Sequence, residues 1–154
     1  MQANLKDVGI EMKIVNFPGA TFFATFTEGG AYVSRKYDIV GLNGGLPSLD
    51  PNIRLQYHSS EIPTKEKPTG LNLGGISDPE VDRLLDAQLQ TQDNAKRKEI
   101  LWKLQQRIHD IYAIMPMYQK LVVNTVSKRV RGLKTIDHGA VTCIVWNTHE
   151  WWVA

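Results

Sequence analysis

The sequence predicts an α/β fold, a small mixed sheet with flanking helices, because short apolar runs alternate along the chain with longer amphipathic segments. The expected strands are Ile10–Val15, Tyr37–Gly41 and Met115–Val126, and the expected helices are Ala20–Thr27, Asp78–Thr91 and Asp93–Tyr112. With 154 residues, 42% of them hydrophobic, the chain is long and apolar enough for a single core. Its formal net charge of +2 is too small to indicate nucleic acid as a partner.

The first half of the chain contains short elements joined by turns. Gln2–Asp7 has the character of the last turns of a helix, which Gly9 ends. After a Pro-Gly turn, Phe22, Phe23 and Phe26 recur at helical spacing, and we expect these rings to be core rather than a ligand cage. Further on, the sequence predicts a short helix or turn at 52–57 and a proline-containing surface loop at 58–70.

Two consecutive amphipathic helices carry the clearest local signals. Before the first, Asp78 can accept from free backbone N–H groups and Pro79 fits the first helical position. Asp93 opens the second helix and stands four residues before Arg97, a favourable spacing for an ion pair. The predicted buried stripes are Val81, Leu84, Leu85 and Leu89 in the first helix and Ile100, Leu101, Leu104, Ile108 and Ile111 in the second.

The candidate catalytic and metal-binding residues are few and scattered. The histidines are 58, 109, 138 and 149 and the only cysteine is Cys143, so no H-x-x-x-H or C-x-x-C spacing and no internal disulfide exists. Neither a G-x-S-x-G motif nor a phosphate-binding loop is present. We therefore expect no enzyme activity, no metal and no cofactor. The basic residues between 128 and 134 lack interleaved aromatic residues, which favours a solvated face over a nucleic-acid site.

An ordered set of residues in the helix pair and its surroundings resembles a known family. The set is Asn72, Pro79, Val81, Asp82, Leu84, Leu85, Asp93, Arg97, Leu101, Gln105, Ile108 and Ile114-Met115-Pro116-Met117. It is similar to the extracellular solute-binding proteins of ABC importers of the peptide, nickel and oligosaccharide type, bacterial solute-binding protein family 5. Upstream Leu5–Ile10 and Tyr37-Asp38-Ile39 and downstream Val130-Arg131-Gly132 extend the resemblance over most of the chain.

The resemblance implies a two-lobed periplasmic-binding-protein-like fold, of which this chain is a C-terminal, second-lobe portion. Residues 1–138 are then an N-terminally truncated α/β domain, and residues 139–154 a tail that returns to the first lobe. The implied function is capture of a small-molecule, peptide or sugar solute and its delivery to an ABC permease. The implied location is periplasmic or extracellular, associated with the cell envelope.

A glycine-rich loop after the Tyr37–Gly41 segment is the candidate solute site. Open α/β sheets place ligands beyond the carboxyl ends of their strands, so Leu42, Asn43, Gly44 and Gly45 are expected to contact the solute, with Asn72 nearby. A plain glycine turn explains the same residues equally well. Peptide-binding relatives often carry Trp and Asp where this chain has Leu42 and Gly45. This difference favours a sugar-like or otherwise neutral solute, because the carboxylate that meets a peptide amine is absent.

The tryptophan-rich tail leaves a second function open. Trp146, Trp151 and Trp152 would lose packing partners without a first lobe, so the tail predicts self-association of this chain. The tail also allows an alternative function, that of a protein-interaction module that binds its partner through the tail.

Overall fold

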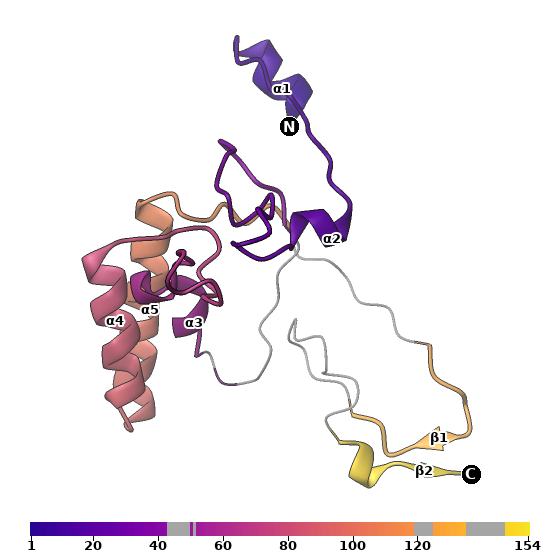
Figure 1. The fold of residues 1–154 in the computed structure, drawn as a ribbon. Helices are drawn as coiled ribbons and strands as arrows, with labels where there is room; N and C mark the ends of the chain where they lie inside the picture. Colours follow the sequence, from indigo (N-terminus) through magenta and orange to yellow (C-terminus); the bar gives the residue numbers. More distant parts are fainter. Residues whose placement is uncertain (43–49, 51, 119–124, 135–146) are drawn as a thin grey trace.

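The computed structural model describes residues 1–42, 50, 52–118, 125–134 and 147–154. The elements are α1 (Gln2–Asp7), α2 (Gly19–Phe22), α3 (Arg54–Tyr57), η1 (Ser59–Glu61), α4 (Pro79–Gln90), α5 (Asn94–Asp110), β1 (Val130–Arg131), η3 (Thr148–Glu150) and β2 (Trp152–Val153). Figure 1 shows α4 and α5 side by side with α3 against them, while α1 and the β1–β2 ribbon lie away from this helical part.

The α4–α5 hairpin confirms the predicted helix pair and contains the core. Asp78 caps α4 by accepting from the N–H groups of Glu80 and Val81 at 3.1 and 3.0 Å, and Asp93 caps α5 in the same way. The buried apolar side chains of the described residues are Val33, Val81, Leu84, Leu85 and Leu104. The last four form one cluster, which is surrounded by Ile53, Tyr57, Ile100, Leu101, Ile108 and Ile111.

Leu89 does not join this core, contrary to the sequence prediction. Its side chain is 46% exposed, whereas Gln88 is fully buried. Successive residues of an α-helix are rotated by about 100° about its axis, so Gln88 lies on the same face as Val81, Leu84 and Leu85. Leu89 lies outside this buried face. The Gln88 Oε1 accepts from Arg97 Nε at 3.1 Å and Nη2 at 2.9 Å, whereas its buried Nε2 has no hydrogen-bond partner among the described residues. Arg97 therefore bonds across the hairpin instead of pairing with Asp93.

The predicted mixed sheet is wrong in its strands. Ile10–Val15 and Tyr37–Gly41 form no ladder, and neither do the described residues of Met115–Val126, of which 119–124 lie outside the described part. The sheet that the described residues form has two strands, β1 and β2, paired antiparallel with Val130 opposite Val153 and Arg131 opposite Trp152. A β-strand exists only through hydrogen bonds to a neighbour, and the described chain places no neighbour beside these apolar segments. The regular elements of the described residues are mostly helices, with one small two-stranded sheet.

Asn147 holds the C-terminal ribbon together. Its buried side chain donates to Gly132 O at 2.7 Å, and its Oδ1 accepts from Trp151 Nε1 at 2.9 Å. Gly132 has φ +80°, and a Cβ there would lie 2.3 Å from Glu150 O, so this turn requires glycine. Trp152 remains 58% exposed, whereas Trp146 lies outside the described residues.

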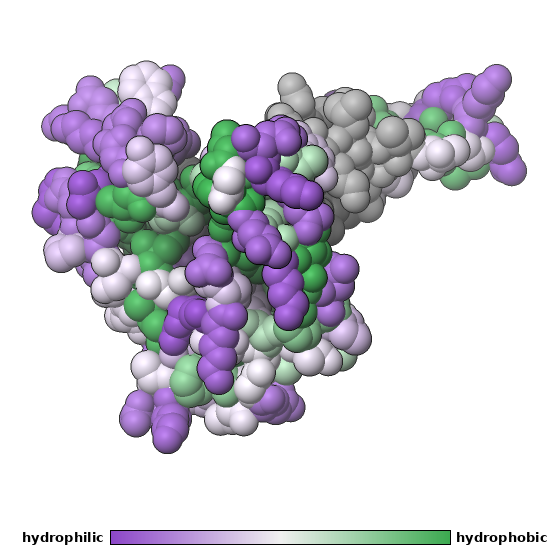
Figure 2. All heavy atoms as spheres, turned by 90° about the horizontal axis from the view of Figure 1, so that it is seen from above, coloured by the Kyte–Doolittle hydropathy of each residue, from purple (hydrophilic) through white to green (hydrophobic). Residues whose placement is uncertain are grey.

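Many large apolar side chains of the described residues lie at the surface. Figure 2 shows apolar residues lying open among hydrophilic ones on the face it presents. The exposed large hydrophobic side chains include Ile10, Ile14, Val15, Phe17, Phe23, Met115, Met117 and Trp152.

Candidate functional site

The predicted solute loop begins at an exposed residue. Leu42 is 48% exposed, and Asn43, Gly44 and Gly45 lie outside the described residues. After the loop, Asp50 forms an ion pair with Arg97 in the first turn of α5. Arg97 thus connects the far end of this loop to Gln88 of α4.

Asn72, the other predicted site residue, is fully buried, and its side chain is hydrogen-bonded to other residues of the chain. Its Nδ2 donates to His58 O at 3.1 Å and to Ile76 O at 2.7 Å, and its Oδ1 accepts from Ile76 N at 3.0 Å. Its backbone N–H donates to Glu61 O at 2.9 Å. Asparagine followed closely by glycines is a common signal for such a side chain-stabilised turn. In this structure Asn72 fixes the 72–76 turn, and its side chain has no surface open to a solute.

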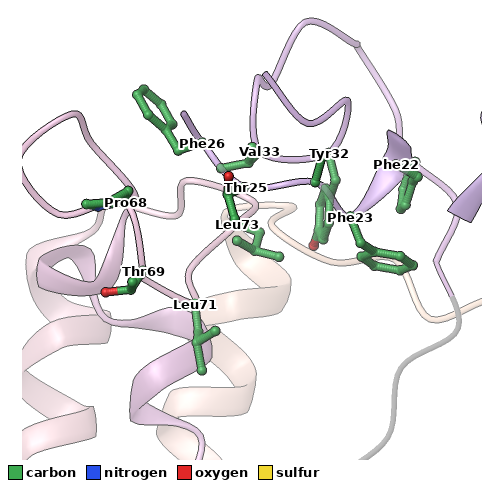
Figure 3. A pocket seen from close by; sticks show the side chains of 12 residues that line it. Phe22, Phe23, Thr25, Phe26, Tyr32, Val33, Pro68, Thr69, Leu71 and Leu73 are labelled. Carbon is green, nitrogen blue, oxygen red and sulfur yellow. The ribbon is translucent and has the colours of Figure 1, made fainter. Parts of the chain in front are cut away.

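A hollow about 200 Å³ in volume lies between the 22–33 segment and the 68–73 segment. We call it the aromatic hollow, and Figure 3 shows its lining. Its walls are Phe22, Phe23, Ala24, Thr25, Phe26, Tyr32, Val33, Pro68, Thr69, Gly70, Leu71 and Leu73. A cavity of about 150 Å³ with apolar walls holds one benzene molecule, so the aromatic hollow has room for one ring with a short substituent.

The aromatic rings in the wall contact one another in fixed geometry. Phe22 stacks on Tyr32 with centroids 5.5 Å apart and planes at 10°, and Phe23 meets the edge of Phe22 at 4.8 Å and 89°. The sequence predicts Phe22, Phe23 and Phe26 as core residues, but none of them is buried and Phe23 is 59% exposed. The predicted helix that would bury them has only the four residues of α2, so the rings line a surface instead.

Backbone contacts shape the first wall. The N–H groups of Ala31 and Tyr32 donate to Thr21 O and Phe22 O at 3.2 and 3.1 Å, which folds residues 23–30 into a closed loop. Gly30 closes that loop, because a Cβ there would lie 1.9 Å from Ala24 O. Thr25 Oγ1 donates to Glu28 at 2.7 Å within the loop, and this bond holds the pKa of Glu28 below its ordinary value.

The second wall is held to the helices by a polar network. Gly70 allows the chain to lie against Glu61, since a Cβ at this position would be 2.2 Å from Glu61 O. Lys67 Nζ pairs with Glu61 at 2.8 Å, and this contact lowers the pKa of Glu61. Arg54 Nε donates to Asp86 of α4 at 2.8 Å and lowers the pKa of that carboxyl. Arg54 Nη1 also lies 3.4 Å from Glu61 Oε1, so this network links the wall to α4.

The lining determines what the aromatic hollow can bind. No charged side chain lines it, so it suits an apolar ring rather than an ion.

Within the described part of the chain, no three His, Cys, Asp or Glu residues are grouped to hold a metal ion. Among the described residues no helix is long and apolar enough to cross a membrane.

Comparison with known proteins supports a fold of the periplasmic-binding-protein kind, of which this chain forms a lobe-like part. NikZ from Campylobacter jejuni, solved in complex with Ni(L-His), superposes with a TM-score of 0.59 at 20% sequence identity. The match covers 97% of this chain but 29% of NikZ, so the chain spans less than a third of that protein. No family model matches the chain, and no curated protein matches it. The likeness to NikZ shows the fold alone.

Proposed function

We propose that this chain is part of the second lobe of an extracellular solute-binding protein, which captures a solute and delivers it to an ABC import permease. The observation that carries the proposal is the agreement of a sequence resemblance with a structural likeness, the second of which covers 97% of the chain. The ordered residues from Asn72 to Met117 resemble family 5 binding proteins, and the fold follows a part of NikZ, which was solved holding a small metal–amino-acid complex. Receptors of this kind work outside the cytoplasmic membrane.

In this proposal the solute meets the chain at the glycine-rich loop from Leu42 to Gly45. Leu42 offers an exposed apolar side chain, and glycines allow a ligand to approach the backbone closely. Asn72 takes a supporting role, because its amide holds the neighbouring turn. Ligand capture then depends on closure of two lobes, which excludes water and completes the hydrogen bonds.

The proposal also accounts for the large exposed surface. The first lobe of the same receptor would cover the apolar side chains that include Ile10, Val15 and Trp152. On its own, the 154-residue chain should cover them with a second copy. Light scattering at micromolar concentration should therefore give the mass of a dimer or larger oligomer, whereas a monomer mass with cooperative melting would show that the chain needs no cover.

Ligand screening of the full-length gene product tests the function. Thermal shift and calorimetric titration should use a nickel–histidine complex, short peptides and neutral oligosaccharides. One class should raise the melting temperature and bind with a stoichiometry of one, as mass action requires of a ligand that binds the native state alone. Failure of every class, together with the absence of permease genes beside its own gene, would refute the proposal.

The exposed tail supports a second candidate, a protein-interaction module. Trp152 and Val153 are 58% and 64% exposed on a two-stranded ribbon, and unpaired strand edges bind other chains readily. A module of this kind would bind its partner without any solute. Removal of residues 147–154 should then abolish partner binding, whereas it should leave solute contacts at Leu42–Gly45 in place.

A further inference from the structure

Arg35 carries a charge that nothing in the described part of the chain neutralises. Its Nη1 is buried and has no hydrogen-bond partner among the described residues, and no described carboxylate pairs with it. Burying a polar nitrogen without a partner is costly. Arg35 is also one of two non-glycine residues with positive φ in the described chain, at 53°. Strained backbone beside an unsatisfied cation is a combination that ligand binding explains.

The Arg35 side chain packs against the turn that contains Gly74 and Gly75. Gly75, at φ +71°, lies so close that a Cβ on it would be 2.5 Å from Arg35 Cδ. The preceding Gly74 faces Tyr32, whose hydroxyl lies 4.0 Å from the position of an added Cβ. The Arg35 side chain and the Tyr32 hydroxyl therefore approach adjacent residues of one turn, the turn that Asn72 fixes.

Two further tyrosines belong to the same cluster. The ring of Tyr37 lies 6.3 Å from that of Tyr32. Burial raises the pKa of Tyr37, an effect that Tyr32 increases and Arg35 opposes, and burial with Tyr32 also raises the pKa of Tyr57. All three phenols are thus neutral donors at neutral pH. None of their hydroxyls hydrogen-bonds to another described residue, so the cluster presents donors and a cation without a described carboxylate.

We infer that Arg35 with Tyr32, Tyr37 and Tyr57 binds the carboxylate of a small organic acid whose apolar body occupies the aromatic hollow. A guanidinium matches a carboxylate through two parallel N–H bonds, and tyrosine hydroxyls supply additional donors. Tyr32 connects the two parts of the site, because its ring lines the aromatic hollow (Figure 3) and its hydroxyl approaches Gly74 beside the Arg35 side chain. The hollow's volume of about 200 Å³ fits one ring with a short chain.

This site uses other residues than the proposed solute loop and does not depend on the transport function. Arg35 precedes the Tyr37–Gly41 segment, whereas Leu42 follows it. The ligand it fits is an aryl-alkyl carboxylate, so the natural choice of probe is 3-phenylpropionate. The neutral 3-phenylpropanol keeps the ring and lacks the charge. Acetate and inorganic phosphate keep the charge and lack the ring.

Calorimetric titration of the 154-residue chain with these four probes tests the inference. Phenylpropionate should bind tenfold or more tightly than phenylpropanol, acetate or phosphate. Arg35→Asn removes the charge while asparagine tolerates positive φ, and it should weaken phenylpropionate binding roughly ten- to hundredfold without changing phenylpropanol binding. Phe23→Ala should weaken both ring-bearing probes. Arg83→Asn is the matched control, since Arg83 pairs with Glu80 on the exposed side of α4, and should bind like the wild type.

Each contrary outcome overturns a stated part of the inference. Equal binding of phenylpropionate and phenylpropanol, or wild-type affinity in Arg35→Asn, would show that Arg35 is not an anion site. Equal binding of acetate and phenylpropionate would remove the aromatic hollow from the site. Arg35→Lys keeps the charge and loses the two-pronged geometry, so it should retain partial affinity if Arg35→Asn does not fold. Full affinity in Arg35→Lys, or absence of phenylpropionate binding at millimolar concentration, would also refute it.

Discussion

We predict that the stability of the α4–α5 hairpin depends on the carboxylate of Asp78, which bonds to Arg107. Asp78 caps α4 and also accepts from Arg107 of α5, at 2.6 Å to Nη2 and 3.1 Å to Nε. Its side chain is 13% exposed, so water replaces these partners only in part when they are lost. Two substitutions separate the helix cap from the ion pair with Arg107. Asp78→Asn keeps an acceptor for the cap and loses the charge, and Asp78→Ala removes the cap and the ion pair.

The magnitude follows from the bonds. Loss of an N-cap acceptor costs about 1 kcal/mol, within a range of roughly 0.5–2. Asp78→Ala should lower the free energy of unfolding by at least that amount, because it also leaves Arg107 without its carboxylate. Asp78→Asn should cost less, since Oδ1 can still accept from the N–H groups of residues 80 and 81. The half-exposed Arg107 adds a smaller, salt-dependent term.

The same carboxylate makes the difference between variants depend on pH. Hydrogen bonds from Arg107 and from the N–H of Val81 lower the pKa of Asp78 from 3.8 to about 2 in the folded chain. A lowered pKa contributes stability above the unfolded value, and this contribution is lost as the pH falls from about 4 through 2. The gap between wild type and Asp78→Asn should therefore be full at pH 6 and shrink towards pH 2.

Urea unfolding followed by circular dichroism at 222 nm measures both effects. It should be run at several protein concentrations, because oligomer formation shifts the midpoint. The reasoning fails if Asp78→Ala unfolds at the wild-type midpoint, or if the gap between wild type and Asp78→Asn stays constant between pH 6 and pH 2.

Three further predictions test the core, the second wall of the aromatic hollow and the Asn72 turn. Leu85→Ala should cost roughly 2–5 kcal/mol because Leu85 is fully buried, and Leu89→Ala, at a half-exposed site, should cost far less in the same urea titration. Gly70→Ala should destabilise the wall around Glu61, whereas Gly41→Ala, with open space around it, should not; thermal melts compare the two. Asn72→Ala should cost roughly 1–3 kcal/mol, since it leaves buried partners without hydrogen bonds, and hydrogen exchange should then rise in the 72–76 turn.

Local chemistry explains which parts of the fold the sequence predicted. The caps at Asp78 and Asp93 and the end of α1 at Gly9 depend on neighbouring residues only, and all three are confirmed. The strands depend on partners far along the chain, and apolar character alone does not supply a partner. Arg97 shows the same limit at the level of one side chain. Asp93, its predicted partner, caps α5, whereas Arg97 bonds to Gln88 and pairs with Asp50, which only the tertiary structure brings near it.

The candidate site was less predictable than the helices, for a physical reason. The residue type of Asn72 fits both a ligand contact and a turn, and only its burial decides between them. Arg35 gives no sequence signal, because its importance lies in a positive φ and in the absence of a nearby described carboxylate. The segments that form the aromatic hollow lie more than thirty residues apart in the sequence, so their meeting is a tertiary property.

The distribution of burial connects the fold to the proposed function. Among the described residues, four of the five buried apolar side chains belong to the α4–α5 hairpin, so this part has its own source of stability. The aromatic hollow is attached to that hairpin through Arg54 and Asp86, whereas the segment before α2 and the terminal ribbon lie open. A receptor lobe needs this division, because a rigid base must hold the ligand-contacting loops while a second lobe closes over the remaining surface. In the proposed receptor, the first lobe should therefore raise the stability of the open segments, whereas that of the hairpin should not change.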